Sequence, residues 1–374
     1  MTNTAFACGS SETIAPTLLD RLGESAAEAS LVIFFGHVDL DGRAIGDALR
    51  SHFVGVPIIG CSANGAFSDQ GFGQKGCAAI AVPRATAPRV VATLARLGDD
   101  VDAAVARAGA DLSRALGRSV RELDFERHVG LMLVEGATQR EERVNEAIGN
   151  IAPSLRFVGG SAGDDIKFSR TWAYCDGELA YDGCAFAVLE VAAPYGIIHC
   201  CNLRPSGTTV QVTRVEPGTR IIRELDGQPA ARFFARLAGK EPAELTFVDF
   251  LERPLGLMID DLPWLRSGVR VEGDGVLFAC SVVEGATLDI MSPRELVADT
   301  REQIAQLEKN LAGPIDSAIL FNCAYRMIEA RLRGTEAAYH TALGAFSHAG
   351  MHTNGESYLG HINQTLTGLV FRKR

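Results

Sequence analysis

No stretch of this 374-residue sequence has the length of a membrane-spanning segment. A transmembrane helix needs about 18 or more consecutive apolar residues, and the apolar runs here are shorter although apolar residues make up 47% of the chain. The N-terminal "MTNTAFACGSSETIAP" also lacks the basic leader and apolar core of a secretory signal peptide. We therefore expect a soluble, cytoplasmic protein that does not bind a membrane.

The sequence lacks a cysteine pattern that would indicate a zinc site or a disulfide framework. Its nine cysteines are an odd number, most stand in apolar segments, and no two form a Cys-x-x-Cys pair. We expect reduced, mostly buried thiols and no metal site.

Clustered positive charge is also missing. The chain has 36 Lys and Arg against 46 Asp and Glu, for a formal net charge of −10, and its basic residues are scattered. Nucleic-acid affinity depends strongly on counterion release by clustered basic residues, so we expect no nucleic-acid partner.

Three segments repeat one order of elements. The apolar runs "LVIFFGH" from residue 31, "VGLMLVEG" from 129 and "SAILFNCAYR" from 317 are typical of buried strands. Each is followed by a helical segment, a glycine-containing turn and another strand. Because the turn lies roughly 30 residues after the strand start each time, the pattern indicates repeated units. The predicted fold class is α/β (mixed α+β), with repeated strand–helix–strand–strand units and mixed sheets.

The region between the second and third units has a different pattern. Residues 197–227 alternate apolar and polar positions and contain Pro and Gly, as antiparallel strands do. Further on, Ser292-Pro293-Arg294-Glu295 is a capping box that predicts a helix start. We predict an N-terminal segment (1–29), an N-terminal domain (30–210) and a C-terminal domain (211–374).

The glycine-containing turns at 60–65, 159–164 and 350–355 occupy equivalent places in the three units. In open α/β sheets, ligands bind where strand ends open into such loops. Turn chemistry alone is the alternative, because Gly and Asn readily adopt positive φ. We expect the three turns to converge on one ligand-binding hollow.

Several catalytic motifs match only in part. The G-x-G-x-x-G at 71–76 precedes a strand rather than a helix, which argues against a dinucleotide site. The G-x-S-x-G around Ser161 also lacks the helix of a nucleophile elbow, and Cys61 has no basic neighbour to activate its thiol. We expect no catalysis, with an enzyme that uses Cys61 or Ser161 as nucleophile as the alternative.

Charged and imidazole groups near the third turn leave several interpretations open. Arg326 and Glu356 either form a mutual salt bridge or bind the two ends of a zwitterion. His352 and His361 lack a third ligand with metal-site spacing. His352 is a candidate axial ligand for haem, which one histidine can hold, and His199 is a second candidate.

Five motifs carry a family resemblance. "IIGCSANGAF", "FVGGSAGDD", "VTRVEPGTRIIRELDGQPA", "FNCAYR" and "GMHTNGE" occur in an order that resembles the FIST family of bacterial sensory proteins, over roughly residues 30–370. The resemblance implies a non-catalytic sensor that binds a small molecule such as an amino acid. It also implies a signalling partner in trans, such as a histidine kinase or a cyclic-di-GMP enzyme. One subgroup of stand-alone FIST proteins of this size looks like haem-based nitric oxide sensors that control a partner kinase, and the resemblance of this chain to it makes haem a candidate cofactor.

The resemblance also implies the ligand-binding residues, to which we add His352 from the argument above. They come from the three turns and from the strand that precedes the third turn. The predicted set is Cys61, Ser62, Asn64, Ser161, Gly163, Asp164, Asn322, Arg326, His352, Thr353, Gly355 and Glu356.

Overall fold

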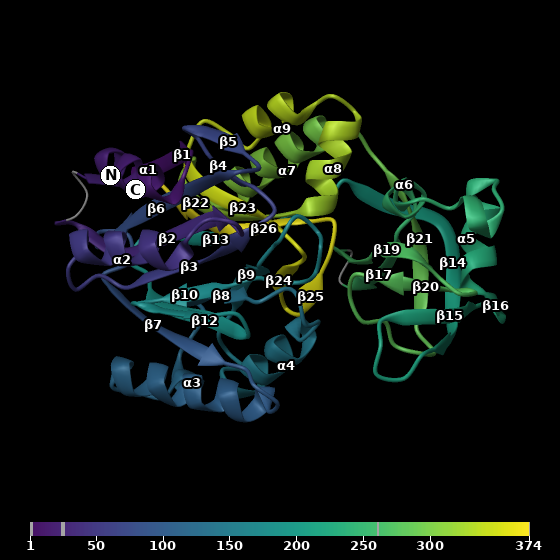
Figure 1. Ribbon diagram of the computed structural model, residues 1–374, viewed down its shortest axis with the longest axis horizontal. Coiled ribbons are helices and arrows are strands. Elements are labelled where there is room, and N and C mark those ends of the chain that lie inside the picture. The colour runs from purple at the N-terminus through teal and green to yellow at the C-terminus, as the bar shows by residue number, and fades with distance from the viewer. Residues whose placement is uncertain (1–2, 24–26, 260–261, 374) are drawn as a thin grey trace.

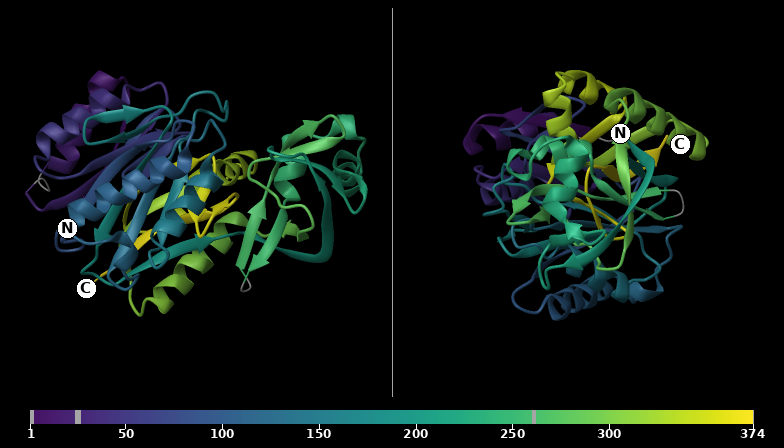
Figure 2. Two further views of the ribbon diagram at one scale, coloured as in Figure 1. Left: turned by 90° about the horizontal axis from the view of Figure 1, so that it is seen from below. Right: turned by 90° about the vertical axis from the view of Figure 1, so that its right-hand side faces the viewer.

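The computed structural model describes residues 3–23, 27–259 and 262–373. The chain forms a larger body that carries both termini, and a smaller body at one end of it (Figure 1; Figure 2). The smaller body, residues 203–293, is called the inserted module because the elements on either side of it in the chain belong to the larger body. Among the described residues, no helix is long and apolar enough to span a membrane.

Three units with one order of elements build the larger body, as the sequence predicts. The first consists of β1 (Asn3–Cys8), α1 (Ser11–Leu22), β2 (Ala29–His37), α2 (Gly42–His52), β3 (Ile58–Ala63), β4 (Ala66–Ser68), β5 (Gly71–Gly73) and β6 (Gly76–Pro83). The second consists of β7 (Arg89–Arg96), α3 (Val101–Leu116), a 3-10 turn (Val120–Glu122), β8 (His128–Val134), α4 (Glu141–Ile151), β9 (Phe157–Ser161), β10 (Ala173–Cys175), β11 (Glu178–Ala180) and β12 (Gly183–Glu190). The third consists of β13 (Tyr195–Cys200), α7 (Leu296–Asn310), β22 (Ile315–Cys323), α8 (Ala324–Leu332), α9 (Glu336–Ala342), β23 (Ser347–Thr353), β24 (Glu356–Tyr358), β25 (His361–Ile362) and β26 (Leu366–Arg372).

Each unit places a parallel pair of strands inside one mixed sheet. The pairs are β2–β3, β8–β9 and β22–β23, and antiparallel strands flank them. β2 is apolar along its length because both of its faces are buried: Phe35 faces a core shared by all three sheets, and Phe34 faces the helices outside. The mixed sheets of the prediction are therefore confirmed.

The hairpin of each unit joins the sheet of another unit. β10–β11 of the second unit pairs with β3, β24–β25 of the third pairs with β9, and β4–β5 of the first pairs with β23. The exchange is cyclic, so every sheet is completed by a hairpin from a different part of the chain.

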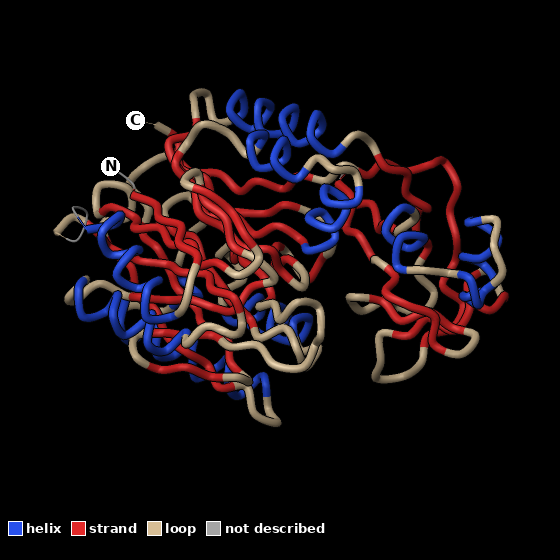
Figure 3. The backbone as a smooth tube through the Cα atoms, turned by 45° about the horizontal axis from the view of Figure 1, so that its top comes forward, coloured by secondary structure: helices blue, strands red, loops and turns tan. Residues whose placement is uncertain are grey.

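The three sheets surround one apolar core, with helices on the outside. Phe35 and Phe321 meet in this core with ring centroids 5.9 Å apart. Figure 1 shows α1 and α2, α3 and α4, and α7 to α9 on three sides of the body, and Figure 3 shows the strands inside this cover. The carboxyl ends of the parallel strands meet near the centre of the body.

The inserted module has its own antiparallel sheets and core. Its elements are β14 (Leu203–Val215), β15 (Ile221–Leu225), β16 (Gln228–Pro229), α5 (Ala230–Ala238), a 3-10 turn (Pro242–Glu244), α6 (Phe247–Glu252), β17 (Leu255–Ile259), β18 (Leu262–Arg266), β19 (Gly268–Glu272), β20 (Gly275–Phe278) and β21 (Thr287–Pro293). α5 ends at Gly239, whose φ of 67° is the left-handed conformation that glycine adopts after a helix C-terminus. A buried ion pair docks the module: Arg220 donates to Glu141 and Glu142 of α4, at 2.6 Å each.

Two expected element boundaries are wrong. The helix predicted to begin at Ser292 begins at Leu296, because Ser292 and Pro293 pair with β14 and the Glu295 carboxylate caps the helix instead. The segment after β22 is helical from Ala324, so Arg326 lies in the first turn of α8 rather than at a strand end. The apolar residues of "FNCAYR" continue across the change from strand to helix, so the sequence did not show where the strand ends.

Candidate functional site

The three glycine-containing turns meet at the centre of the larger body. Backbone hydrogen bonds link each turn to the other two and close a ring, which we call the turn ring. Its bonds run from Asn64 N–H to the His352 carbonyl (3.0 Å), from Gly163 N–H to the Ser62 carbonyl (3.0 Å) and from Asn354 N–H to the Ser161 carbonyl (3.1 Å).

The turn ring is filled by its own side chains. Ser62, Ser161 and Thr353 lie at or next to the ends of β3, β9 and β23, and all three are fully buried. The Asn64 side-chain amide donates to Asn354 Oδ1 at 2.8 Å. The turns therefore converge as expected, but their side chains contact one another at the meeting point.

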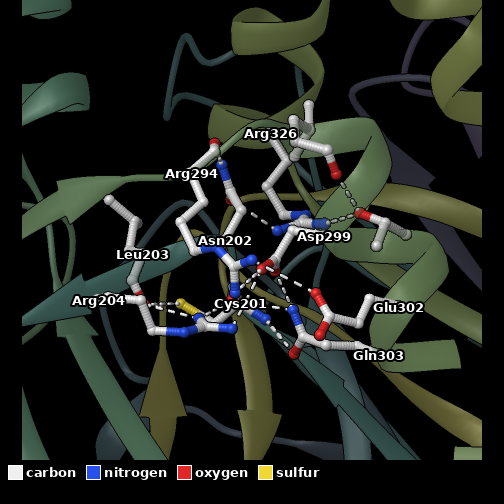
Figure 4. Close-up of polar contacts among 11 residues, drawn as sticks. Cys201, Asn202, Leu203, Arg204, Arg294, Asp299, Glu302, Gln303 and Arg326 are labelled. Carbon is white, nitrogen blue, oxygen red and sulfur yellow. Dashed lines mark hydrogen bonds and ion pairs between the residues drawn. The ribbon is translucent and has the colours of Figure 1, made fainter. Parts of the chain in front are cut away.

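Arg326 is buried among neutral oxygen atoms (Figure 4). Only 1% of it is exposed, and its guanidinium donates to Asn202 Oδ1 at 2.9 Å, Thr300 Oγ1 at 2.8 Å and Asn322 Oδ1 at 3.2 Å. Among the described residues it forms no ion pair with Glu356, so the mutual salt bridge is not formed. Asn202 lies where the chain enters the inserted module, which connects Arg326 to that junction.

Glu356 is fully buried and bonds to two threonines. Its carboxyl group accepts from the hydroxyls of Thr353 (2.5 Å) and Thr365 (2.6 Å) and from the Thr365 N–H (3.1 Å). Burial raises the pKa of the Glu356 carboxyl to about 7, against these bonds, which lower it. Glu356 therefore changes its charge near neutral pH.

This pKa predicts how stability depends on pH. The folded-state pKa of Glu356 lies above its ordinary value of 4.5, so its contribution to stability is present below about pH 4.5 and is lost as pH rises to about 7. The free energy of unfolding should therefore fall by about 2–3 kcal/mol over this pH range because of Glu356, and we expect Glu356→Gln to abolish that part of the pH dependence. Urea unfolding of both proteins at pH 5 and pH 7.5 measures it, because the other titrating groups cancel in the comparison. Equal pH dependence in the two proteins would contradict this prediction.

His352 and Cys61 are enclosed. The His352 ring accepts from the Asn322 amide at 2.9 Å in the tautomer that this contact requires. It packs against Phe67 with ring centroids 5.0 Å apart, and burial lowers the pKa of His352.

Burial raises the pKa of the Cys61 thiol, which contacts Met351 Sδ at 3.2 Å, so the thiolate is disfavoured. The Ser161 hydroxyl is buried without a hydrogen-bond partner among the described residues. The expected lack of catalysis stays a prediction.

Asp164 shapes a loop that forms one wall of a large cavity. Its carboxylate accepts from the backbone N–H groups of Phe168 (2.9 Å), Ser169 (2.7 Å) and Arg170 (3.0 Å). The loop faces the first turn of α2 across a cavity of about 740 Å³, which we call the α2 cavity. Of the predicted site residues, Asp164 lies in the lining of this cavity.

The α2 cavity is lined by charged side chains of both signs and by apolar side chains. Its charged lining residues are Asp39, Asp41, Arg43, Asp164, Lys167 and Arg170, and its larger apolar ones are Val38, Leu40, Trp172, Leu179 and Tyr181. The Arg170 guanidinium lies over the Tyr181 ring, 4.2 Å from the ring centroid. A volume of this size is typical of small-molecule pockets.

Trp172 is a lining residue of the α2 cavity. It is 2% exposed, and its indole N–H has no hydrogen-bond partner among the described residues. Gly42 permits this position, because a Cβ there would come within 2.6 Å of the ring. Sequence reasoning missed Trp172 and its neighbours, although "DDIKFSRTW" places both signs of charge beside one of only two tryptophans.

Comparison with known proteins identifies the family. The model of the FIST N domain matches residues 30–228, and that of the FIST C domain matches residues 230–358. The chain belongs to the FIST family. FIST domains are ligand-binding sensory domains, which gives this FIST protein a general sensory role.

Individual relatives add little about the ligand of this FIST protein. An uncharacterized protein of Methanocaldococcus jannaschii is 23% identical over 324 residues, which cover 81% of this chain and 61% of the relative. The match thus spans less than two thirds of the relative's length. A solved cyanuric acid hydrolase from A. caulinodans covers the whole of both chains at 9% identity and a TM-score of 0.36, a likeness too low to support an argument.

Proposed function

We propose that this FIST protein is a sensor that binds a zwitterionic, amino-acid-like molecule in the α2 cavity and signals to a partner protein. The observation that carries the proposal is a cavity lined by opposite charges and apolar side chains, among them Trp172, whose indole N–H has no partner among the described residues. An amino acid presents the complementary groups, a carboxylate, an ammonium and a side chain.

The cavity walls offer a partner for each end of such a ligand. Arg43, Lys167 and Arg170 suit a carboxylate, to which the Trp172 N–H adds a neutral donor. Asp39, which is exposed, suits an ammonium group. Charge-assisted hydrogen bonds contribute about 1.5–3 kcal/mol each, and micromolar affinity requires about 8 kcal/mol. Three such contacts together with burial of an apolar side chain reach that range.

The cavity is placed so that a ligand would bridge two units. One wall is the first turn of α2 in the first unit, and the other is the 164–172 loop of the second unit. A ligand shifts a conformational equilibrium only if it binds one state more tightly, and a bridging ligand favours the state in which the walls are close. The proposed reader of that state is a histidine kinase or a cyclic-di-GMP enzyme acting in trans, as the FIST resemblance implies.

Isothermal titration calorimetry with the standard amino acids tests this proposal. We expect at least one to bind saturably, and at a hundred times its dissociation constant it should raise the unfolding free energy by about 2.7 kcal/mol. Arg170→Met should weaken binding at least tenfold, whereas Arg114→Met, on the exposed face of α3, should not change it. Failure of every amino acid to bind, or equal affinity in the Arg170→Met protein, would refute the proposed ligand class.

The haem that the resemblance implies does not fit the candidate histidines well. The His352 ring is enclosed by Asn322 and Phe67, which leaves no open face for a macrocycle. The His199 ring nitrogens have no hydrogen-bond partner among the described residues, but the two hollows that His199 lines have volumes of only about 310 and 200 Å³. A haem is larger than the drug-sized ligands that occupy pockets of about 300–1,000 Å³. Haem binding stays a prediction, and no step of the proposed function depends on it.

A further inference from the structure

His199 lies at the junction between the larger body and the inserted module. It stands near the end of β13, an edge strand of its sheet, and Trp264 of β18 reaches it from the module with ring centroids 5.4 Å apart. Tyr358 lies near it on another side at 6.0 Å. The two hollows beside His199 are separate from the α2 cavity, with which they share no lining residue.

Three buried polar atoms at this junction have no hydrogen-bond partner among the described residues. They are both ring nitrogens of His199 and the indole Nε1 of Trp264. Buried polar groups are bonded in the great majority of cases, and each one left unpaired costs about 1–3 kcal/mol. Two of the three atoms belong to His199, which lines both hollows, and they indicate a place where a ligand supplies a missing partner.

The larger hollow, of about 310 Å³, has a neutral lining. It consists of Ile197, Ile198, His199, Cys200, Leu262, Gln303, Gln306, Leu307, Asn310 and Tyr358. Burial, and after it the charge of Arg326, lower the pKa of His199 to about 4, so the imidazole is neutral at pH 7. A neutral imidazole has one nitrogen that accepts a hydrogen bond and one that donates. The site therefore favours an uncharged ligand that carries a hydrogen-bonding group.

We propose that a small neutral aromatic molecule with one hydroxyl or N–H group, of the phenol and indole class, binds in the larger hollow beside His199. The ligand's O–H or N–H donates to the acceptor nitrogen of His199. Its ring packs against Leu262, Leu307 and Tyr358, since aromatic rings favour such tilted contacts. The volume lies at the lower end of the small-molecule range of about 300–1,000 Å³, which suits one or two fused rings.

A ligand at this position would contact both bodies of the protein. Ile197 and Leu307 belong to the larger body, while Leu262 belongs to β18 of the inserted module. Small-molecule sites occur preferentially at such interfaces. This second site does not depend on the amino-acid site proposed above.

Calorimetric titration of the full chain with indole and 1-methylindole tests the proposal, because the methyl group removes only the N–H donor. We expect saturable binding of indole and at least tenfold weaker binding of 1-methylindole. His199→Leu should abolish this preference, and Arg170→Met, which alters the α2 cavity, should leave it unchanged. Phenol and anisole form a second matched pair with the same expected order.

A second variant keeps the test valid if His199→Leu fails to fold. Leu262 is 43% exposed and lines both hollows, so Leu262→Trp should fill the site and abolish indole binding without loss of folding. Absence of saturable binding by both indole and phenol to the unaltered protein would overturn the proposal. So would an unchanged indole preference in the His199→Leu protein, or unchanged binding in the Leu262→Trp protein.

Discussion

Arg220→Met should lower the free energy of unfolding by about 3–5 kcal/mol, the typical cost of breaking a buried ion pair. Arg220 is 6% exposed and bridges Glu141, which is 1% exposed, and Glu142 in the first turn of α4. Removing the guanidinium leaves two carboxylates close together without their cation. We expect the inserted module to loosen from the larger body, which urea unfolding and limited proteolysis of the full chain can measure.

Two further proteins separate this effect from a general loss of charge. Arg214 forms an ion pair with Glu224, and the Arg214 side chain is 55% exposed. Arg214→Met breaks this exposed pair and should lower the free energy of unfolding by less than about 1 kcal/mol. Combining Arg220→Met with Glu141→Gln and Glu142→Gln should recover much of the lost stability, because no unpaired charge stays buried. A loss below about 1 kcal/mol for Arg220→Met would show that the ion pair does not hold the module.

Gly159→Ala should lower the free energy of unfolding more than any other Gly→Ala substitution in the protein. Gly159 lies in β9, and a Cβ there would come within 1.8 Å of the Met132 carbonyl oxygen in the neighbouring strand. Backbone atoms cannot yield as a side chain does, so β8 and β9 must separate near the turn ring. We expect a loss of more than about 4 kcal/mol, in the range that marks an exceptional substitution, or failure to fold.

Gly149→Ala is the matched control because it adds the same methyl group in the same unit. Gly149 lies on the exposed face of α4, and no atom of the described residues comes within 4 Å of its Cβ position. Alanine there should raise the free energy of unfolding by about 0.5–1 kcal/mol, through its higher helix propensity. Thermal unfolding of the two variants side by side measures the contrast, and equal stability would contradict the close approach at Gly159.

Local sequence patterns predicted the three units and the meeting of their turns. The apolar run of β2 and the glycines of the turns can each be recognised within a few residues of sequence. Their recurrence at similar spacing along the chain supported the prediction of repeated units. The exchange of hairpins was not predicted, because β10 pairs with a strand more than a hundred residues earlier in the chain. Such pairing depends on the assembled core and leaves no local mark.

The candidate site was predicted less well than the fold. The predicted site residue Asp164 lies in the lining of a cavity, but most of the groups that give the cavity its chemistry follow in the loop, from Lys167 to Trp172. Arg326 was predicted as a ligand-binding residue because it is a charge in an apolar segment. In the structure its guanidinium donates to Asn202 and Thr300 inside the protein. Sequence shows that a charge is buried, but only the fold shows what it faces.

The cyclic exchange of hairpins has a consequence for synthesis of the chain. β3 emerges from the ribosome long before β10, and β9 emerges long before β24. Until those later segments appear, the nascent sheets expose unpaired strand edges, which are prone to aggregation. Completion of the larger body therefore awaits β24 and β25, so a chain that terminates before them leaves an open edge on β9 rather than a smaller folded protein.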